Sequence, residues 1–299
     1  MKEGSAANAG RPTLHVDTGR EMRGGQWQAL YLVERLGGAV LLAPSDSALL
    51  TEGQRRGLQV RALSFFELRS AARKCSLIHA HDARAHTMAC LACGARTPLV
   101  VSRRVAFPVK RGFFSQWKYA HASMYLAVSK FVAARLMDVG IRGARIRVVP
   151  DGVPIPAEPA KPVAGRVVAL ASKPVEIPGI PVHLTSRLWE DLSTASVFVY
   201  QSELEGLGSA ALAAMAAGVP VVAGAVGGLP EAVEHEQTGL LVRDGDFAGA
   251  VRRLLDNPAW ATELGRRGRE RVREEFSVET MVEKTERAYR EVLNGEAVE

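Results

Sequence analysis

Short, continuous apolar segments alternate with helix-like segments over nearly the whole chain, and this alternation restricts the folds available to it. Parallel strands buried on both faces read as uninterrupted apolar runs, whereas half-solvated strands alternate apolar and polar residues. Strands that alternate with helices predict α/β layers with right-handed crossovers. The segments expected to be strands are 14–17, 39–43, 77–80, 98–102, 125–129, 146–149, 167–171, 181–184, 197–200, 220–223 and 240–242.

One proline-rich segment, residues 150–163, interrupts this pattern with five prolines and an Asp-Gly turn. Proline lacks an amide donor and has a fixed φ, so this segment is neither a helix nor an inner strand. A length of 299 residues also favours two domains over one. We expect two α/β domains, residues 11–152 and 164–276, joined by a linker at 153–163.

The C-terminal residues 277–299 are expected to form a helix whose apolar residues fall roughly on one stripe. The stripe contains Met281, Ala288, Tyr289 and Val292. Such a stripe has to pack on another element, and the first domain is a candidate partner.

The composition excludes several classes of protein. No apolar run reaches the ~20 residues of a membrane-spanning helix, and the N-terminus lacks the apolar core of a secretory signal. Three cysteines suit a reducing compartment, so we expect a cytoplasmic protein. Cys90 and Cys93 form a lone CxxC, which we interpret as small buried side chains because a metal site would need further ligands.

The formal net charge of +6 is compatible with an anionic substrate, an anionic membrane surface or nucleic acid. No nucleic-acid recognition motif is present. One basic cluster, interleaved with phenylalanines, suits a lipid interface or an acidic acceptor, although a plain basic surface is the alternative. It contains Arg103, Arg104, Lys110, Arg111 and Lys118. A second basic group at 266–273 is mixed with glutamates and is interpreted as a solvated helix face.

Glycine-rich turns mark the most informative part of the chain. Glu205-Gly206-Leu207-Gly208 follows an expected strand and precedes an alanine-rich helix, and Gly227-Gly228 opens another short helix. Glycines at a helix start let backbone amides approach a phosphate, and the helix dipole favours the anion. Open parallel sheets bind ligands at the carboxyl ends of their strands, so we expect a site between the two domains.

In this order and spacing the motifs resemble the donor half of the family 4 glycosyltransferases. The shared patterns are S-x-x-E-G-x-G, A-M-A-A-G-x-P-V-V, G-G-x-P-E and T-G-x-L-V, and the resemblance covers about residues 13–290. It implies two Rossmann-like domains facing across a cleft, the GT-B fold. It also implies sugar transfer with retention from a nucleotide-diphosphate donor, with no cofactor and no metal.

The resemblance also implies roles for single residues. Glu205 matches the first glutamate of the E-x7-E motif, which approaches the donor sugar, and His81 is similar to the histidine that faces the transferred sugar. These two are the expected catalytic residues. The residues expected near the donor diphosphate are Gly24, Gly25, Lys173, Gly206, Leu207, Gly208 and Ser209.

Two departures from the family pattern concern the donor site. The second glutamate of E-x7-E is replaced by Ala213, which removes a carboxylate that holds the nucleotide ribose. Loss of such charge-assisted bonds costs about 1.5–3 kcal/mol. The segment from Asp151 to Glu205 is also short, because fewer than two βαβ units of about 30 residues fit within it.

The resulting hypothesis is a glycosyltransferase that uses a glycan or lipid-linked acceptor in cell-surface polysaccharide or lipopolysaccharide synthesis, in the cytoplasm or at the inner face of the membrane. One alternative is a non-catalytic protein that binds sugar nucleotides or glycans. Another is epimerisation of a sugar nucleotide, which would need acid/base residues beyond His79 and His81.

Overall fold

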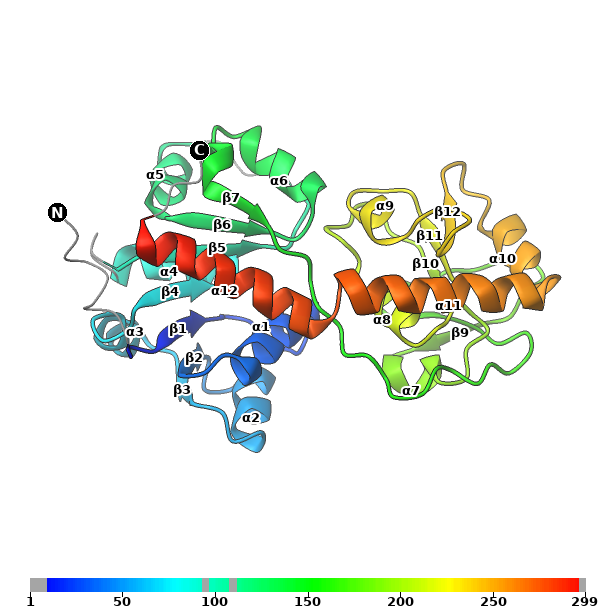
Figure 1. Ribbon diagram of the computed structural model, residues 1–299, viewed down its shortest axis with the longest axis horizontal. Coiled ribbons are helices and arrows are strands. Elements are labelled where there is room, and N and C mark those ends of the chain that lie inside the picture. The colour runs from blue at the N-terminus through cyan, green and yellow to red at the C-terminus, as the bar shows by residue number, and fades with distance from the viewer. Residues whose placement is uncertain (1–9, 93–96, 108–111, 296–299) are drawn as a thin grey trace. The chain divides into compact units, whose positions relative to one another are not determined.

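The computed structural model describes residues 10–92, 97–107 and 112–295. It divides into two α/β units (Figure 1). The first contains Met1–Pro150 with Met281–Glu299, and the second contains Asp151–Thr280. The proline-rich residues 153–163 therefore belong to the second unit.

The first unit is built on a seven-stranded parallel sheet in the order β3-β2-β1-β4-β5-β6-β7. Its strands are β1 (Thr13–Val16), β2 (Ala39–Ala43), β3 (Val60–Ala62), β4 (Leu77–Ala80), β5 (Leu99–Arg103), β6 (Met124–Ala127) and β7 (Ile146–Val148). Its helices are α1 (Gly24–Arg35), α2 (Ala48–Arg55), α3 (Phe65–Ala72), α4 (Ala83–Ala92), α5 (Phe113–His121), α6 (Lys130–Met137) and most of α12 (Val278–Asn294), with a 3-10 turn at Gly143–Arg145.

Helix α12 packs on this first sheet through the predicted stripe (Figure 1). Met281, Ala288 and Tyr289 are buried. The Tyr289 hydroxyl lies 2.6 Å from Nδ1 of His79 on β4. The Arg147 guanidinium on β7 donates to Glu291 over 2.7 Å. Two polar contacts and an apolar stripe thus connect the C-terminal helix to the sheet.

Replacing Tyr289 by phenylalanine is expected to lower the free energy of unfolding by about 1–3 kcal/mol, because a buried nitrogen of His79 loses its partner. Urea unfolding measures the change. Tyr31→Phe is the matched control, since the structure gives that partly exposed hydroxyl no hydrogen bond to a described residue. Equal losses in the two variants would contradict a role for the Tyr289 contact.

The second unit is built on a five-stranded parallel sheet in the order β12-β11-β10-β8-β9. Its strands are β8 (Val167–Leu170), β9 (Val182–Thr185), β10 (Val197–Tyr200), β11 (Val221–Gly224) and β12 (Gly239–Val242). Its helices are α7 (Leu188–Leu192), α8 (Ser209–Ala216), α9 (Leu229–Ala232), α10 (Phe247–Leu255) and α11 (Pro258–Glu275).

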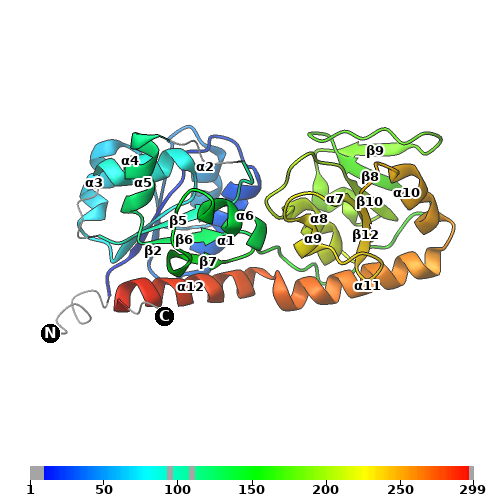
Figure 2. The same ribbon diagram turned by 90° about the horizontal axis from the view of Figure 1, so that it is seen from above.

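The connection between β8 and the edge strand β9 contains no helix (Figure 2). Parallel strands usually need a crossover of a dozen or more residues, most often helical. Here Val175 and Ile177 of the extended connection are buried in the core that β8, β10, α10 and α11 form. These two side chains supply apolar cover that a crossover helix would otherwise give.

The sequence correctly predicted two parallel α/β sheets, and the ends of the predicted strands lie within two residues of the observed ends. Strand β3 was missed, because it is short, lies at the sheet edge and has two exposed residues among its three. Among the helices of the described residues, none is both long and apolar enough to cross a bilayer.

Candidate active site

Glu205 lies in the loop that joins β10 to α8, and its carboxylate is held by a compact polar cluster. The Lys173 ammonium, from the segment after β8, donates to Glu205 Oε2 over 2.6 Å. It also donates to the hydroxyls of Tyr200 and Ser202 at 3.0 and 2.9 Å. The Tyr200 hydroxyl donates in turn to Glu205 Oε2 over 2.7 Å. The predicted cation and the predicted catalytic carboxylate therefore meet at the carboxyl edge of the second sheet.

Solvent still reaches this ion pair, with side-chain exposures of 32% for Lys173 and 20% for Glu205. A ligand at this edge can therefore contact either group. Burial, and next the negative charge of Glu205, raise the pKa of Tyr200, so its hydroxyl stays protonated and donates to the carboxylate. Sequence reasoning missed Tyr200 and Ser202, although both flank the end of a predicted strand.

The second glycine-rich loop fixes the shape of the first. Gly227 has a φ of +57°, and a Cβ placed there would lie 2.0 Å from the carbonyl oxygen of Glu205. The next amide, of Gly228, donates to that same oxygen over 3.0 Å. Gly208, the N-cap of α8, has a φ of +98°, where a Cβ would lie 2.6 Å from Leu229. Only glycine satisfies both contacts, so the two loops form one unit around Glu205.

Gly227→Ala is expected to displace the Glu205 loop and so to weaken ligand binding at that loop. It should also lower the free energy of unfolding by about 1–3 kcal/mol. Gly245→Ala is the matched control, because it has a φ of +85° but open space around a Cβ. Thermal unfolding and nucleotide titration of both variants measure the difference. Similar behaviour of the two would show that left-handed strain alone, and not contact with Glu205, matters at Gly227.

The start of α8 supplies the amides that sequence analysis assigned to a diphosphate. The Leu207 side chain is buried, so this residue faces a ligand only through its backbone. The Ser209 hydroxyl donates to the buried carboxylate of Asp151 over 2.8 Å. Ser209 is therefore engaged within the protein through its side chain, which sequence analysis did not anticipate.

Ala213 lies on α8 and is buried, with 3% exposure. The position that carries a ribose-binding carboxylate in the family pattern thus faces the protein interior, and a methyl group occupies it. A nucleotide bound at this edge has no acceptor from residue 213.

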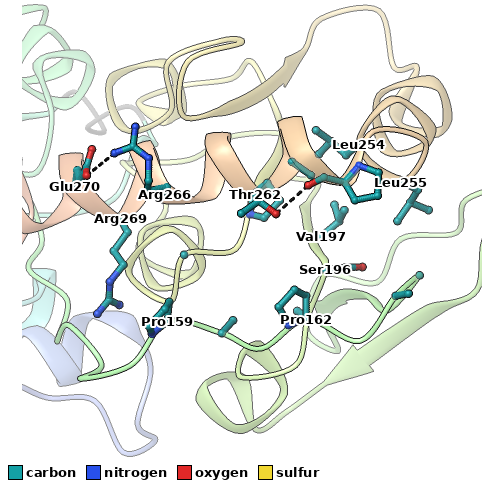
Figure 3. A pocket seen from close by; sticks show the side chains of 18 of the residues that line it. Pro159, Pro162, Ser196, Val197, Leu254, Leu255, Thr262, Arg266, Arg269 and Glu270 are labelled. Carbon is teal, nitrogen blue, oxygen red and sulfur yellow. Dashed lines mark hydrogen bonds and ion pairs between the residues drawn. The ribbon is translucent and has the colours of Figure 1, made fainter.

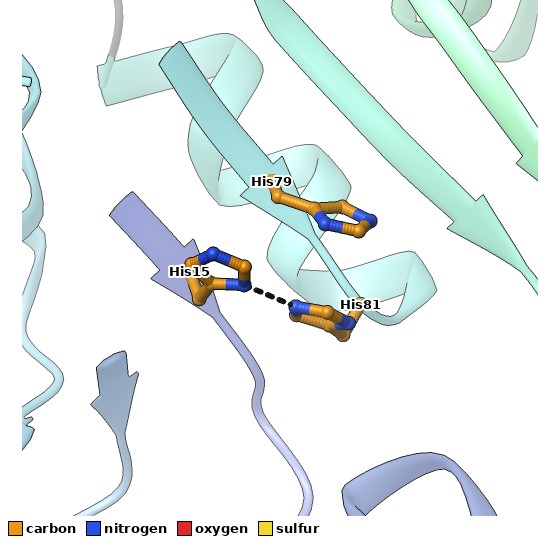
Figure 4. A group of neighbouring side chains, drawn as sticks. All are labelled: His15, His79 and His81. Atoms are coloured by element: carbon orange, nitrogen blue, oxygen red, sulfur yellow. Dashed lines mark hydrogen bonds between the residues drawn. The ribbon is translucent and has the colours of Figure 1, made fainter. Parts of the chain in front are cut away.

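In the first unit, three histidines gather where β1 and β4 lie side by side (Figure 4). His15 Nδ1 lies 2.9 Å from His81 Nε2, and the guanidinium of Arg104 lies 3.4 Å from His81 Nδ1. Arginine only donates, so neutral His81 accepts at Nδ1 and carries its proton on Nε2, which donates to His15. The third ring, His79, contacts the Tyr289 and Ser102 hydroxyls at 2.6 and 2.8 Å.

All three rings are buried and uncharged near neutral pH. Burial, followed by the charge of Arg104, lowers the pKa of His15 to about 3. Burial also lowers the pKa values of His79 and His81 well below their ordinary range, and the neighbouring histidines and Arg104 add to the effect. His81 is only 5% exposed and both of its ring nitrogens are engaged. A sugar can reach the His81 ring only if Arg104 or His15 releases it.

These histidines are the metal-ligating side chains that lie close enough together, among the described residues, to hold an ion. The hydrogen bonds of His79 and His81 already use their ring nitrogens, and the guanidinium of Arg104 beside His81 repels a cation. We interpret the group as a hydrogen-bonded core cluster. Cys90 is buried, as expected for the CxxC, and Cys93 lies outside the described residues.

The remaining residues assigned to the first unit have different positions. Gly24 and Gly25 begin α1 at the carboxyl edge of the sheet, and Gly24 is exposed. Arg103 donates to the Phe107 carbonyl over 2.6 Å and so stabilises the loop after β5, whereas Arg104 joins the histidines. Lys110 and Arg111 lie outside the described residues.

Two aspartates that sequence analysis did not assign order the same edge. Asp17 accepts bonds from the Gly19 amide at 2.7 Å and the Gln26 side chain at 2.9 Å, and burial raises its pKa. Asp82 accepts from the Thr18 amide and hydroxyl at 2.6 and 2.9 Å. Asp17 comes directly after β1 and Asp82 two residues after β4, and a carboxylate at the end of a buried strand is the signal that could have identified them.

Two models of known protein families match the chain. A model described as "Glycosyltransferase Family 4" matches residues 31–155, and one described as "Glycosyl transferases group 1" matches residues 182–271. The two matches follow one another along the two units. The chain belongs to the family 4 glycosyltransferases. Its Glu205 loop lies within the second match.

Similar proteins include the alpha-maltose-1-phosphate synthase of Mycolicibacterium smegmatis, which is 44% identical over 117 residues, covering 36% of this chain and 30% of that protein. The N-acetyl-alpha-D-glucosaminyl L-malate synthase of Bacillus anthracis is 36% identical over 110 residues, covering 36% of this chain and 29% of that protein. This family 4 chain thus matches less than a third of the length of these relatives.

Solved structures share its fold. The Anabaena protein HepE, crystallised in complex with UDP and glucose, has a TM-score of 0.79 and 15% identity, covering 93% of this chain and 98% of that one. Sucrose-phosphate synthase from Thermosynechococcus elongatus has a TM-score of 0.73 and 20% identity, and the match covers 95% of this chain and 100% of that one. The fold is that of GT-B glycosyltransferases, with two Rossmann-like domains.

Proposed function

We propose that this chain transfers a sugar from a nucleotide-diphosphate donor, with Glu205 orienting the sugar beside the start of α8. The observation that carries the proposal is the carboxylate of Glu205, held by Lys173 and framed by two glycine-rich loops. Membership in the family 4 glycosyltransferases supports it. So does the sugar-nucleotide ligand of the structural neighbour HepE, which was crystallised with UDP-glucose.

Departure of a nucleotide diphosphate leaves developing negative charge, which must be stabilised where it forms. Backbone amides from Gly206 to Ser209 and the ammonium of Lys173 would provide that stabilisation. Lys173 binds Glu205, so the phosphate would share or replace this carboxylate contact. This arrangement keeps the site neutral until an anion arrives. We propose that no metal ion or other cofactor is required, and that the sugar is transferred with retention.

For the acceptor we propose a glycan or a lipid-linked glycan, consistent with synthesis of cell-surface polysaccharide or lipopolysaccharide. The support is that Phe107, Phe113 and Phe114, which follow Arg103 in the chain, are 64%, 88% and 56% exposed. Basic and aromatic side chains together suit the surface of an anionic membrane. We propose His81 as a contact of the transferred sugar, reached when the guanidinium of Arg104 moves away from its Nδ1 atom.

A panel of UDP-, GDP- and ADP-sugars tests the function. We expect one base to raise the melting temperature clearly, because a ligand at 100 times its dissociation constant stabilises by about 2.7 kcal/mol. The stabilising sugar nucleotide should also be consumed when a glycan or lipid-linked acceptor is present. Absence of both stabilisation and consumption for every member of the panel would contradict the proposal.

One observation favours a second function, a non-catalytic protein that binds sugar nucleotides. Ala213 removes a carboxylate of the E-x7-E pattern, and the second unit lacks a helix between β8 and β9. Binding of a sugar nucleotide with neither transfer nor hydrolysis would support this second function over the transferase.

A further inference from the structure

A cavity of about 580 Å³ lies within the second unit, at the amino ends of its strands (Figure 3). Glu205, in contrast, follows the carboxyl end of β10, so the two sites occupy opposite edges of one sheet. The volume falls in the range of about 300–1,000 Å³ typical of small-molecule sites. The cavity is therefore separate from the proposed donor site.

The walls of this cavity are mainly apolar. Pro159 and Pro162 come from the proline-rich segment before β8, and Leu254 and Leu255 come from the end of α10. Val197 and Pro220 close it at the strand ends. Water gains few hydrogen bonds in such a chamber, so an apolar ligand that displaces it is favoured.

Helix α11 contributes basic residues to the cavity lining, among them Arg266 and Arg269 (Figure 3). Arg266, Arg269 and Arg273 follow one another at spacings of three and four residues, which places them on one helix face. Arg266 is neutralised by Glu263 and Glu270, at 2.7 and 2.5 Å. Glu270, the acidic residue in the cavity lining, is thus already paired.

Arg266, Arg267 and Arg273 are exposed, as expected for a solvated face, but Arg269 is buried, with 9% exposure, so the expectation is wrong for this residue. Its guanidinium donates to the carbonyls of Ala216, Pro156 and Ala157. These carbonyls satisfy donors but carry no formal charge. Burial, and next the charge of Arg273, lower the pKa of Arg269, with Glu158 acting weakly in the opposite sense. A buried cation without a carboxylate bound to it is costly, and an anion would offset that cost.

Arg273 is the second cation of this group. It is exposed, and the structure shows no ion pair between it and any other described residue. Two positive charges without carboxylate partners therefore stand at one side of an apolar chamber. An apolar chamber with two cations at one side is complementary to a molecule with an apolar body and an anionic head.

We propose that this cavity binds an amphiphilic anion, with the apolar body among the prolines and leucines and a carboxylate or phosphate head at Arg269 and Arg273. The inference depends on the second unit alone and is independent of the proposed transfer reaction.

Calorimetric titration of the full chain with decanoate and decyl phosphate, both kept below their micelle concentrations, tests the proposal. We expect one-to-one binding of at least one of them, and binding of uncharged decanol that is at least about tenfold weaker. Anionic phospholipid vesicles form a separate arm of the experiment. Binding to vesicles without binding to either monomeric anion would overturn the proposal of an enclosed site.

Three variants locate the site. Arg273→Gln should weaken binding of the anion about five- to tenfold, whereas Arg267→Gln, on the same helix but outside the cavity lining, should leave it unchanged. Ala164→Trp, at an exposed position of the lining, should block the chamber and abolish binding. Equal effects of the two arginine variants, or full binding by Ala164→Trp, would contradict the assignment. The melting temperature and the far-UV circular dichroism of each variant show whether the second unit is folded.

Discussion

Replacing Glu205 by glutamine is expected to lower the rate of sugar transfer about 10- to 100-fold. The amide keeps the size of the side chain but loses the charge that pairs with Lys173 over 2.6 Å and accepts from Tyr200 over 2.7 Å. Hydrogen bonds to charged groups contribute about 1.5–3 kcal/mol, and each 1.4 kcal/mol corresponds to a factor of ten in rate. Initial rates with the sugar nucleotide selected by the panel measure the loss.

Glu203→Gln is the matched control, because Glu203 lies in the same loop, is exposed and makes the same change of charge. We expect it to retain nearly the rate of the unmodified chain. A Glu205→Gln variant as active as Glu203→Gln would remove Glu205 from the proposed site. Loss of folding, checked by the melting temperature, would separate a structural role from a role in binding the sugar.

The largest expected effect on stability is a decrease in the free energy of unfolding of the first unit as pH falls below about 6.5. Burial lowers the pKa values of His15 and His86 to about 3, and those of His79 and His81 well below the ordinary value. Between about pH 3 and 6.5 the unfolded chain binds protons that the folded chain does not, so stability falls as pH falls. Each such histidine lowers the free energy of unfolding by about 1.4 kcal/mol for every unit that the pH falls in this window.

Asp17 acts in the opposite direction, because burial raises its pKa and the folded state then binds its proton more readily. One carboxylate offsets only part of the contribution of four histidines. We therefore expect the first unit to lose several kcal/mol between about pH 7 and pH 5. Urea unfolding followed by tryptophan fluorescence measures it in a Trp189→Phe, Trp260→Phe variant, whose remaining tryptophans lie in the first unit. Unchanged stability over this range would contradict the uncharged histidine cluster.

The fold was largely predictable because buried parallel strands leave long apolar runs in the sequence. Strand β3 left no such run, since Arg61 and Ala62 are exposed. In helix α11 the sequence predicted a solvated face where one arginine is buried. Its Arg269 is surrounded by charged neighbours in the sequence, yet three carbonyls from distant segments bind its guanidinium in the interior. Local charge pattern carries no information about such long-range partners.

The candidate site was predictable where it depends on backbone. The glycines at 208 and 227 are required by positive φ and close approach, and a short motif records that requirement. Side chains that reach the site from neighbouring strands were harder to assign. The contact of Arg104 with His81 depends on β5 lying beside β4, and the contact of Lys173 with Tyr200 depends on β8 lying beside β10. Sheet order, which no short motif encodes, decides both contacts.

The central claim is that the amides at the start of α8, beside Glu205, hold the diphosphate of the donor. Titration of the isotope-labelled chain with the nucleoside diphosphate selected by the panel, followed through the amide signals of residues 206–209, tests this claim directly. We predict that these signals shift most and do so with the same saturation curve as the gain in melting temperature. Saturating binding that leaves the signals of residues 206–209 unchanged, while amides elsewhere in the chain shift, would contradict the account.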